Sequence, residues 1–199
     1  QDSKFQMGVL HILAGHSGPE TAADARTHFG IFSPQVWKLF PRGHVINLSF
    51  WDYNDVAPGY FAAAEIAARE KKVGVIIIEV ARPDFKVADR SKFADTDVRA
   101  AAKGLYVIRD FAPGVRHGYV VAQGSSATFN LVSVLPRIEQ AGINVKVVSA
   151  ISEELFDRQP AAYQNSVLPP EARQDLMFVS SGTRRMWPLR NVGALTDEY

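Results

Sequence analysis

Residues 15–30, GHSGPETAADARTHFG, carry three side chains that could bind a substrate or move a proton. Histidine is the side chain that ordinarily changes charge near neutral pH, so His16 or His28 could exchange a proton with a carbonyl or hydroxyl group. Asp24 could accept a hydrogen bond from a hydroxyl, and it would share a helix face with His28, four residues further on. Arg82 offers a fork of donors that suits phosphate or carboxylate. These four residues form the candidate site.

Other interpretations of these residues stay open. Polar residues near helix starts often serve only as helix caps or remain in contact with solvent. An arginine at a strand end often forms a structural ion pair. His16, Asp24 and His28 are also ligand types that zinc or iron accepts, which would suit a metal-dependent hydrolase. No HExxH, paired CxxC or EF-hand loop strengthens that hypothesis, so no metal ligand is assigned. A nucleophilic serine is disfavoured, because GSS at 124–126 is not GxSxG.

The first half of the chain predicts a parallel sheet covered by helices. Three apolar runs have the composition of strands buried on both faces: residues 7–15, 44–50 and 73–81. Two segments between them have the composition of helices: residues 19–29 and 56–72. An open parallel sheet binds ligands beyond the carboxyl ends of its strands. We therefore expect His16, Asp24, His28 and Arg82 to meet in one crevice at that edge.

A second α/β unit follows a polar stretch at 83–100, which is expected to be an ordered connector or a linker. Strands are expected at 104–111, 118–124, 144–150 and 175–181, with helical pieces broken at Pro160 after the third of them. The predicted fold class is thus α/β, with two units that are each a largely parallel sheet flanked by helices.

The most strongly marked helix of the second unit covers residues 125–142. Ser125 or Ser126 is expected to cap it, and Gly142 to end it in a left-handed conformation. Pro136 should kink the helix or destabilise it by about 3 kcal/mol. Its apolar stripe has the helical spacing and consists of Leu131, Val134, Leu135 and Ile138.

Composition narrows the function classes. A formal net charge of +1 in 199 residues, with Lys and Arg spread along the chain, argues against nucleic-acid binding. The absence of cysteine excludes disulfides and thiolate sites and fits a cytoplasmic protein. No apolar run is long enough to cross a bilayer, so we expect a soluble chain with no membrane partner.

The remaining histidines and the tryptophans fit structural roles. His11, inside an apolar run, is expected to be a hydrogen-bonded core residue, whereas His44 and His117 are expected in loops. Core or interface positions are expected for the three tryptophans: Trp37, Trp51 and Trp187.

Two stretches of the sequence resemble the transketolase family of thiamine-diphosphate enzymes. HSGPETAADARTH keeps the histidine, the aspartate and the Thr-His of a family segment at matching separations. The longer match begins at YVVAQGSSATFN and includes VKVVS, FDRQ, AAY and SVLP, which resemble landmarks of the family's C-terminal domain. The resemblance implies three divisions of the chain. They are the C-terminal half of a pyrimidine-binding domain at 1–85, a linker at 86–100 and an incomplete transketolase-like C-terminal domain at 101–199.

The resemblance also implies roles for the candidate residues. His16 would contact the sugar phosphate or neighbouring substrate oxygens, and Asp24 would bind a substrate hydroxyl. His28 would lie close to the reacting ketose oxygen, so that both histidines act catalytically, and Arg82 would grip the phosphate. The implied reaction is the transfer of a two-carbon ketol unit between sugar phosphates, with the hard chemistry left to the cofactor.

The sequence departs from the family pattern at three places: Ser17, Ala25-Arg26 and Phe29. We find no counterpart within these 199 residues to the family's diphosphate-binding half, which holds thiamine diphosphate and Mg²⁺. We therefore expect the cofactor only in an assembly with a complementary transketolase half or second subunit, as a homo- or hetero-oligomer, and no cofactor-binding residue is assigned. A non-catalytic interaction module with the same fold is the alternative.

Overall fold

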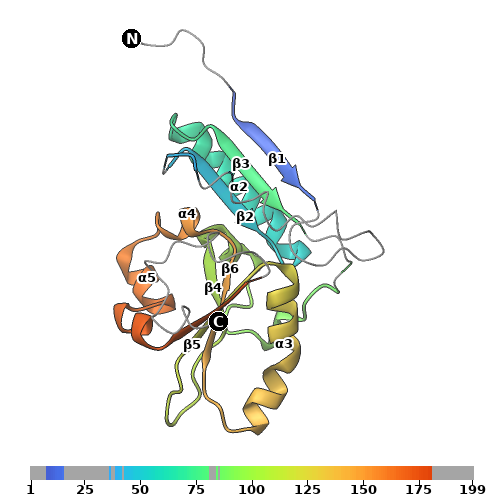
Figure 1. Cartoon of the computed structure of the whole chain (residues 1–199), viewed down its shortest axis with the longest axis vertical. Helices are drawn as coiled ribbons and strands as arrows, with labels where there is room; N and C mark the ends of the chain where they lie inside the picture. Colours follow the sequence, from blue (N-terminus) through green and yellow to red (C-terminus); the bar gives the residue numbers. More distant parts are fainter. Residues whose placement is uncertain are drawn as a thin grey trace.

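The computed structural model describes residues 8–15, 36, 39–41, 43–80, 84 and 86–180. Within them the first sheet has three parallel strands in the order β1-β3-β2. They are β1 (Leu10–Ala14), β2 (Val45–Ser49) and β3 (Val75–Glu79), each inside a predicted run. Helix α2 (Tyr53–Arg69) lies along the sheet (Figure 1). The predicted parallel sheet is confirmed for these strands.

The burial predicted for β1 is wrong. Leu10 and Leu13 are 56% and 70% exposed, whereas Ile76 and Ile77 of the central strand β3 are fully buried. β1 is an edge strand, paired among the described residues with β3 alone. An apolar run therefore predicted the strand correctly but not its place in the sheet.

Helix α2 begins three residues before the predicted start at Val56. Asp52 is its N-cap, and the Asp52 side chain accepts a hydrogen bond from the Asn54 backbone N–H at 3.2 Å. Arg69 lies in the last turn, where a cation complements the helix dipole as expected.

The described part of the connector contains two short 3-10 helices, η2 (Arg90–Lys92) and η3 (Val98–Lys103). Phe93, Ala100 and Ala101 are buried, so this stretch packs into the protein and does not hang free as a tether. This packing could not be predicted from the polar composition, because exposed charged residues separate the buried ones along the sequence. The domain boundaries at 85 and 100 stay a prediction.

The second sheet has four described strands in the order β4-β6-β5-β7. Strands β5 (Tyr119–Gln123), β6 (Lys146–Ala150) and β7 (Leu176–Ser180) run parallel, and only β4 (Leu105–Arg109) is antiparallel to its neighbour β6. The sheet is largely parallel, so the predicted fold class of two such α/β units is confirmed.

Helix α3 (Ser125–Gln140) departs from its prediction at the start and in its apolar stripe. Gly124, with φ +84°, is the N-cap, and the Ser125 hydroxyl instead donates to the Phe50 carbonyl at 2.7 Å. The expected serine cap is therefore wrong, because the Ser125 hydroxyl forms a tertiary hydrogen bond and no side chain caps the start of the helix. Leu131, Leu135 and Ile138 pack on the core as expected, together with Val132, whereas Val134 is 37% exposed.

The end of α3 matches its prediction. Gly142 has φ +70°, the left-handed conformation expected after the last turn. The helix is continuous through Pro136.

The other face of the second sheet carries α4 (Glu153–Phe156), α5 (Ala161–Val167) and the 3-10 helix η4 (Pro170–Gln174). Pro160 is the N-cap of α5 and separates it from α4, as predicted. Among the described residues, no helix is long and apolar enough to cross a membrane.

One hydrophobic core contains buried residues from both sheets, including Leu48 of β2 and Val147 of β6. The backbone also joins the sheets, because the Ser49 N–H donates to the Ile151 carbonyl at 2.8 Å. Figure 1 shows β2 on the side of the first sheet that faces the second unit, with β1 on the far side.

Candidate functional site

The carboxyl ends of all three strands of the first sheet lie at one edge. Ala14 of β1 and Ser49 of β2 both pair in register with Glu79 of β3. The Val80 N–H, just past β3, donates to the Ala14 carbonyl at 3.1 Å. This edge is where an open parallel sheet binds ligands.

All four predicted site residues lie outside the described residues. In the sequence, His16 comes two positions after Ala14, and Arg82 comes three positions after Glu79. Asp24 and His28 belong to the predicted helix at 19–29, which is also outside them. The convergence of these side chains and their roles stay a prediction. What the structure supplies is the shared edge at which β1 and β3 end.

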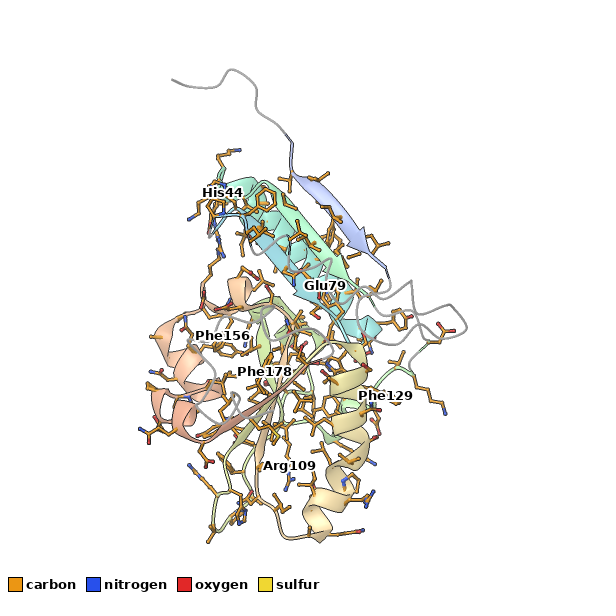
Figure 2. All side chains as sticks on the ribbon, in the orientation of Figure 1. His44, Glu79, Arg109, Phe129, Phe156 and Phe178 are labelled. Carbon is orange, nitrogen blue, oxygen red and sulfur yellow. The ribbon has the colours of Figure 1, made fainter. Side chains whose placement is uncertain are left out.

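Buried polar side chains stand at this edge and were missed from the sequence. Glu79, which is labelled in Figure 2, is only 6% exposed. It accepts a hydrogen bond from the Asn47 side-chain amide at 2.9 Å. The Asn47 backbone N–H donates to the Glu154 carboxylate at 3.3 Å, which links β2 to α4. The available signal was a polar residue inside each apolar run, VINLS and VIIIE.

A second buried polar group, the Arg90 cluster, consists of Trp51, Asp52, Asp55, Arg90 and Tyr106. Arg90 Nη1 lies 2.6 Å from Asp55 Oδ1 and 3.4 Å from Asp52 Oδ2, and all three side chains are 6% exposed or less. The Tyr106 hydroxyl donates to Asp55 Oδ2 at 2.9 Å and accepts from Trp51 Nε1 at 2.7 Å. The cluster joins the start of α2, the connector and β4.

Burial dominates the electrostatics of the Arg90 cluster. Removal from water raises the pKa of Asp55 to about 6, although the adjacent Arg90 guanidinium opposes this shift. Burial likewise raises the pKa of the Tyr106 hydroxyl well above its usual value. Asp55 is thus a buried carboxylate whose partners all belong to the protein, which suits a structural tie between the two units.

The cluster could not be read from sequence spacing. Its ion pair joins residues 35 positions apart, and the hydrogen bond from Tyr106 to Asp55 spans 51 positions. The local signal was Asp52 as a helix N-cap, and it was missed because the helix start was placed at Val56.

The three histidines in the described part of the chain do not belong to the buried pair of Asn47 and Glu79. His11 is exposed, so the expected core position is wrong, but its predicted hydrogen bond exists: its Nδ1 lies 2.9 Å from the Tyr60 hydroxyl. His44 precedes β2, and His117 lies in a loop where its Nδ1 accepts from the Asn144 N–H at 2.8 Å, as expected for loop residues. Trp51 is 5% exposed and belongs to the core.

The described residues give no support to a metal site or to a nucleophilic serine. Among them, no group of three or more His, Cys, Asp or Glu side chains could hold a metal ion. Ser125, which opens α3, is buried and donates to a backbone carbonyl. The predicted hydrolase ligands lie outside this part of the chain, so that hypothesis is untested.

The fold defines the class: an α/β protein built on two largely parallel sheets flanked by helices. Comparisons then give the family. Residues 104–192 match the family model described as the transketolase-like TK C-terminal domain. The chain is 32% identical over 178 residues to the transketolase of Aquifex aeolicus, covering 88% of this chain. It is 31% identical over 167 residues to a plasmid-encoded transketolase of Cupriavidus necator, covering 83% of this chain.

Solved structures agree on the fold. A transketolase mutant from Pichia stipitis superposes with a TM-score of 0.62 at 24% identity, over 80% of this chain and 21% of that one. The transketolase of Leishmania mexicana gives a TM-score of 0.63 at 19% identity, over 85% of this chain and 23% of that one. The chain is a member of the transketolase family, as its sequence motifs predicted.

The match covers only part of the relatives. The chain spans 24% of the Aquifex protein and 23% of the Cupriavidus protein, about a quarter of each. The activity of a whole transketolase is therefore a separate question from family membership.

Proposed function

We propose that this chain is a portion or subunit of a thiamine-diphosphate-dependent transketolase that contributes substrate-binding residues to the transfer of a two-carbon ketol unit between sugar phosphates. The observation that supports this most strongly is the similarity to transketolases over 88% of the chain. The parallel pairing of β1 with β3 adds support, because the segments carrying His16 and Arg82 follow strands that end at one edge.

Each predicted residue has a chemical task in this proposal. The Arg82 guanidinium binds the sugar phosphate through charge-assisted hydrogen bonds. Asp24 accepts a hydrogen bond from a substrate hydroxyl and so fixes the orientation of the sugar chain. His28 donates to the ketose oxygen and moves a proton there, while His16 binds neighbouring oxygens.

The cofactor chemistry belongs to an assembly. Thiamine diphosphate, when bound, would supply the carbanion chemistry that cleaves the carbon-carbon bond beside the ketose carbonyl. We assign the cofactor and its Mg²⁺ to a complementary transketolase half, because the chain matches only about a quarter of whole transketolases, with this chain's residues completing the substrate pocket.

A complementation experiment tests the proposal. The part of the Aquifex aeolicus transketolase that this chain does not match is co-expressed with this chain, and two-carbon transfer is measured with thiamine diphosphate and Mg²⁺. The proposal predicts transfer by the assembled complex, reduced about 100-fold or more by His28→Ala because general acid–base catalysis contributes that much. A complex that assembles but neither takes up cofactor nor transfers the unit contradicts the proposal.

His44→Ala is the matched control for this experiment. His44 is exposed and precedes β2, so it lies at the amino end of the strands, away from the proposed site. Its substitution should leave the rate within about twofold, as for surface changes away from special features. Equal losses for the two histidine variants would show that His28 has no catalytic task.

A further inference from the structure

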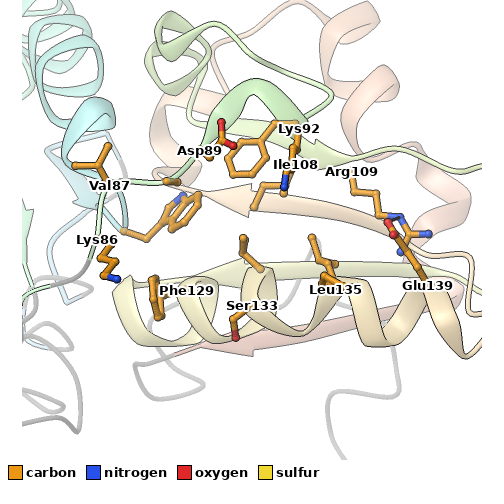
Figure 3. Close-up of a pocket in the computed structure, with 15 residues that line it drawn as sticks. Lys86, Val87, Asp89, Lys92, Ile108, Arg109, Phe129, Ser133, Leu135 and Glu139 are labelled. Atoms are coloured by element: carbon orange, nitrogen blue, oxygen red, sulfur yellow. Dashed lines mark ion pairs between the residues drawn. The ribbon is translucent and has the colours of Figure 1, made fainter.

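A pocket of about 450 Å³ lies between the 86–93 stretch of the connector, β4 and α3 (Figure 3). None of its lining residues belongs to the predicted site. Its volume lies in the range of small-molecule sites in proteins.

The walls of the pocket are apolar and aromatic. Trp51 and Phe93 line one side, with ring centroids 5.9 Å apart and planes inclined by 33°. Phe129 and Leu135 of α3 line it as well, and Ile108 of β4 lies across the pocket from this helix (Figure 3). Flat apolar groups bury well against such surfaces.

The charges around the pocket leave an excess of positive groups. Lys86, Lys92 and Arg109 line it, against the carboxylates of Asp89 and Glu139. Asp89 already accepts hydrogen bonds from the backbone N–H and the hydroxyl of Ser91, at 3.1 and 2.6 Å. Figure 3 shows Lys86 and Arg109 at opposite ends of the pocket.

Arg109 has unused hydrogen-bonding capacity. Its side chain is 16% exposed, and its Nε lies 3.5 Å from the Glu139 carboxylate. Its Nη1 is buried and has no hydrogen-bond partner in the described part of the chain. A buried guanidinium nitrogen without a partner is unfavourable. Because the Arg109 side chain also lines the pocket, an anionic group bound there would lie beside its positive charge.

We propose that this pocket binds a small organic anion with a flat, apolar body, such as an aromatic carboxylate or sulfonate. The body packs between the Trp51–Phe93 side and α3, and the acidic group binds Arg109. This proposal uses none of the four residues proposed for sugar-phosphate binding, so either proposal can fail without the other.

Binding of two fluorescent probes to the 199-residue chain tests the charge requirement. Anilinonaphthalene sulfonate carries the anionic group, and N-phenylnaphthylamine has the same ring types without a charge. We expect one-to-one binding of the sulfonate, at least about tenfold tighter than the neutral probe, because a hydrogen bond to a charged group contributes that much. Equal affinity of the two probes would overturn the proposal.

Variants locate the binding site. Arg109→Gln should weaken sulfonate binding about tenfold or more and leave the neutral probe unaffected. Arg137→Gln, at an exposed position of α3 that does not line the pocket, is the control arginine variant and should bind normally. Equal weakening by both variants would contradict a specific site.

A pocket-filling variant covers the case in which Arg109→Gln perturbs folding. Ser133 is exposed and lines the pocket, so Ser133→Trp should abolish binding of both probes with an unchanged circular dichroism spectrum. Ser133→Ala should bind as the original chain does. Undiminished binding by Ser133→Trp would show that the probes bind elsewhere.

Discussion

The two sides of the first sheet differ in how they are covered. On the closed side, β2 and the start of α2 contact the second unit through Ser49 and Ile151, the shared core and the Arg90 cluster. On the open side, β1 leaves Leu10 and Leu13 exposed. Stability should therefore depend on the closed side, and substitutions on the open side should cost little.

The largest effect is expected at Gly104, where η3 turns into β4 against the segment after β6. Gly104 has φ +87°, and an added Cβ would lie 2.2 Å from the Ser152 carbonyl oxygen. Gly104→Ala should lower the free energy of unfolding by about 4 kcal/mol or more, from backbone strain and overpacking together. Urea denaturation measures the loss.

Gly142→Ala is the control for that prediction. Gly142 also has a positive φ of +70°, but an added Cβ there meets nothing within 4 Å. Only the backbone strain remains, so the loss should be about 1–2 kcal/mol. Similar losses at both glycines would show that the closed side yields to accommodate the methyl group.

The next largest effect is expected from Arg90→Met. Removing the guanidinium leaves the buried carboxylates of Asp52 and Asp55 without their cation, which should cost about 3 kcal/mol. Arg99→Met is the matched control, because the Arg99 side chain is 84% exposed beside Asp97. Chemical denaturation should show no resolvable change in stability for the control. An Arg90→Met variant as stable as the original chain would show that the Arg90 cluster does not stabilise the closed side.

Asp55 should give the closed side a measurable pH dependence. Its pKa is raised to about 6 in the folded chain and returns to about 3.8 on unfolding, so the folded state holds this proton more tightly. The Asp55 contribution is most favourable below about pH 4 and is lost as the pH rises to about 6, a difference of roughly 2–3 kcal/mol.

Comparison with Asp55→Asn isolates this effect from other titrating groups. The stability of the original chain relative to the variant should fall between pH 4 and pH 6 and then level off, because Asn does not titrate. A relative stability that rises over this interval would mean that Arg90 lowers the pKa of Asp55 more than burial raises it.

The smallest effect is expected on the open side. Leu13→Ser removes an apolar side chain that is 70% exposed, so it should change the free energy of unfolding by less than about 0.5 kcal/mol. Thermal unfolding of the two chains in parallel would detect a larger change. A loss comparable to that of Arg90→Met would show that β1 is covered in solution.

The fold could be predicted where neighbouring residues determine it. Apolar runs located β2, β3 and β6, and Gly142 and Pro160 marked element ends because backbone conformation limits which residues fit. These signals are local, so they can be interpreted without knowledge of the tertiary structure.

Features that depend on distant partners could not be predicted. The Ser125 hydroxyl donates a hydrogen bond to the carbonyl of Phe50, 75 positions away, instead of capping its own helix. The Arg90 cluster and the exposure of β1 likewise follow from the arrangement of the sheets. The four candidate site residues were proposed from strand ends and family motifs, and the described structure contributes the shared edge but not their side chains.

A crystal structure of the complemented enzyme with a bound ketose phosphate is the most direct test of the central claim. The account predicts that the Arg82 guanidinium contacts the phosphate, with Asp24 on a hydroxyl and His16 and His28 on oxygens near the reacting carbonyl. An Arg82 side chain that faces away from both histidines, beyond the reach of the sugar, would contradict it.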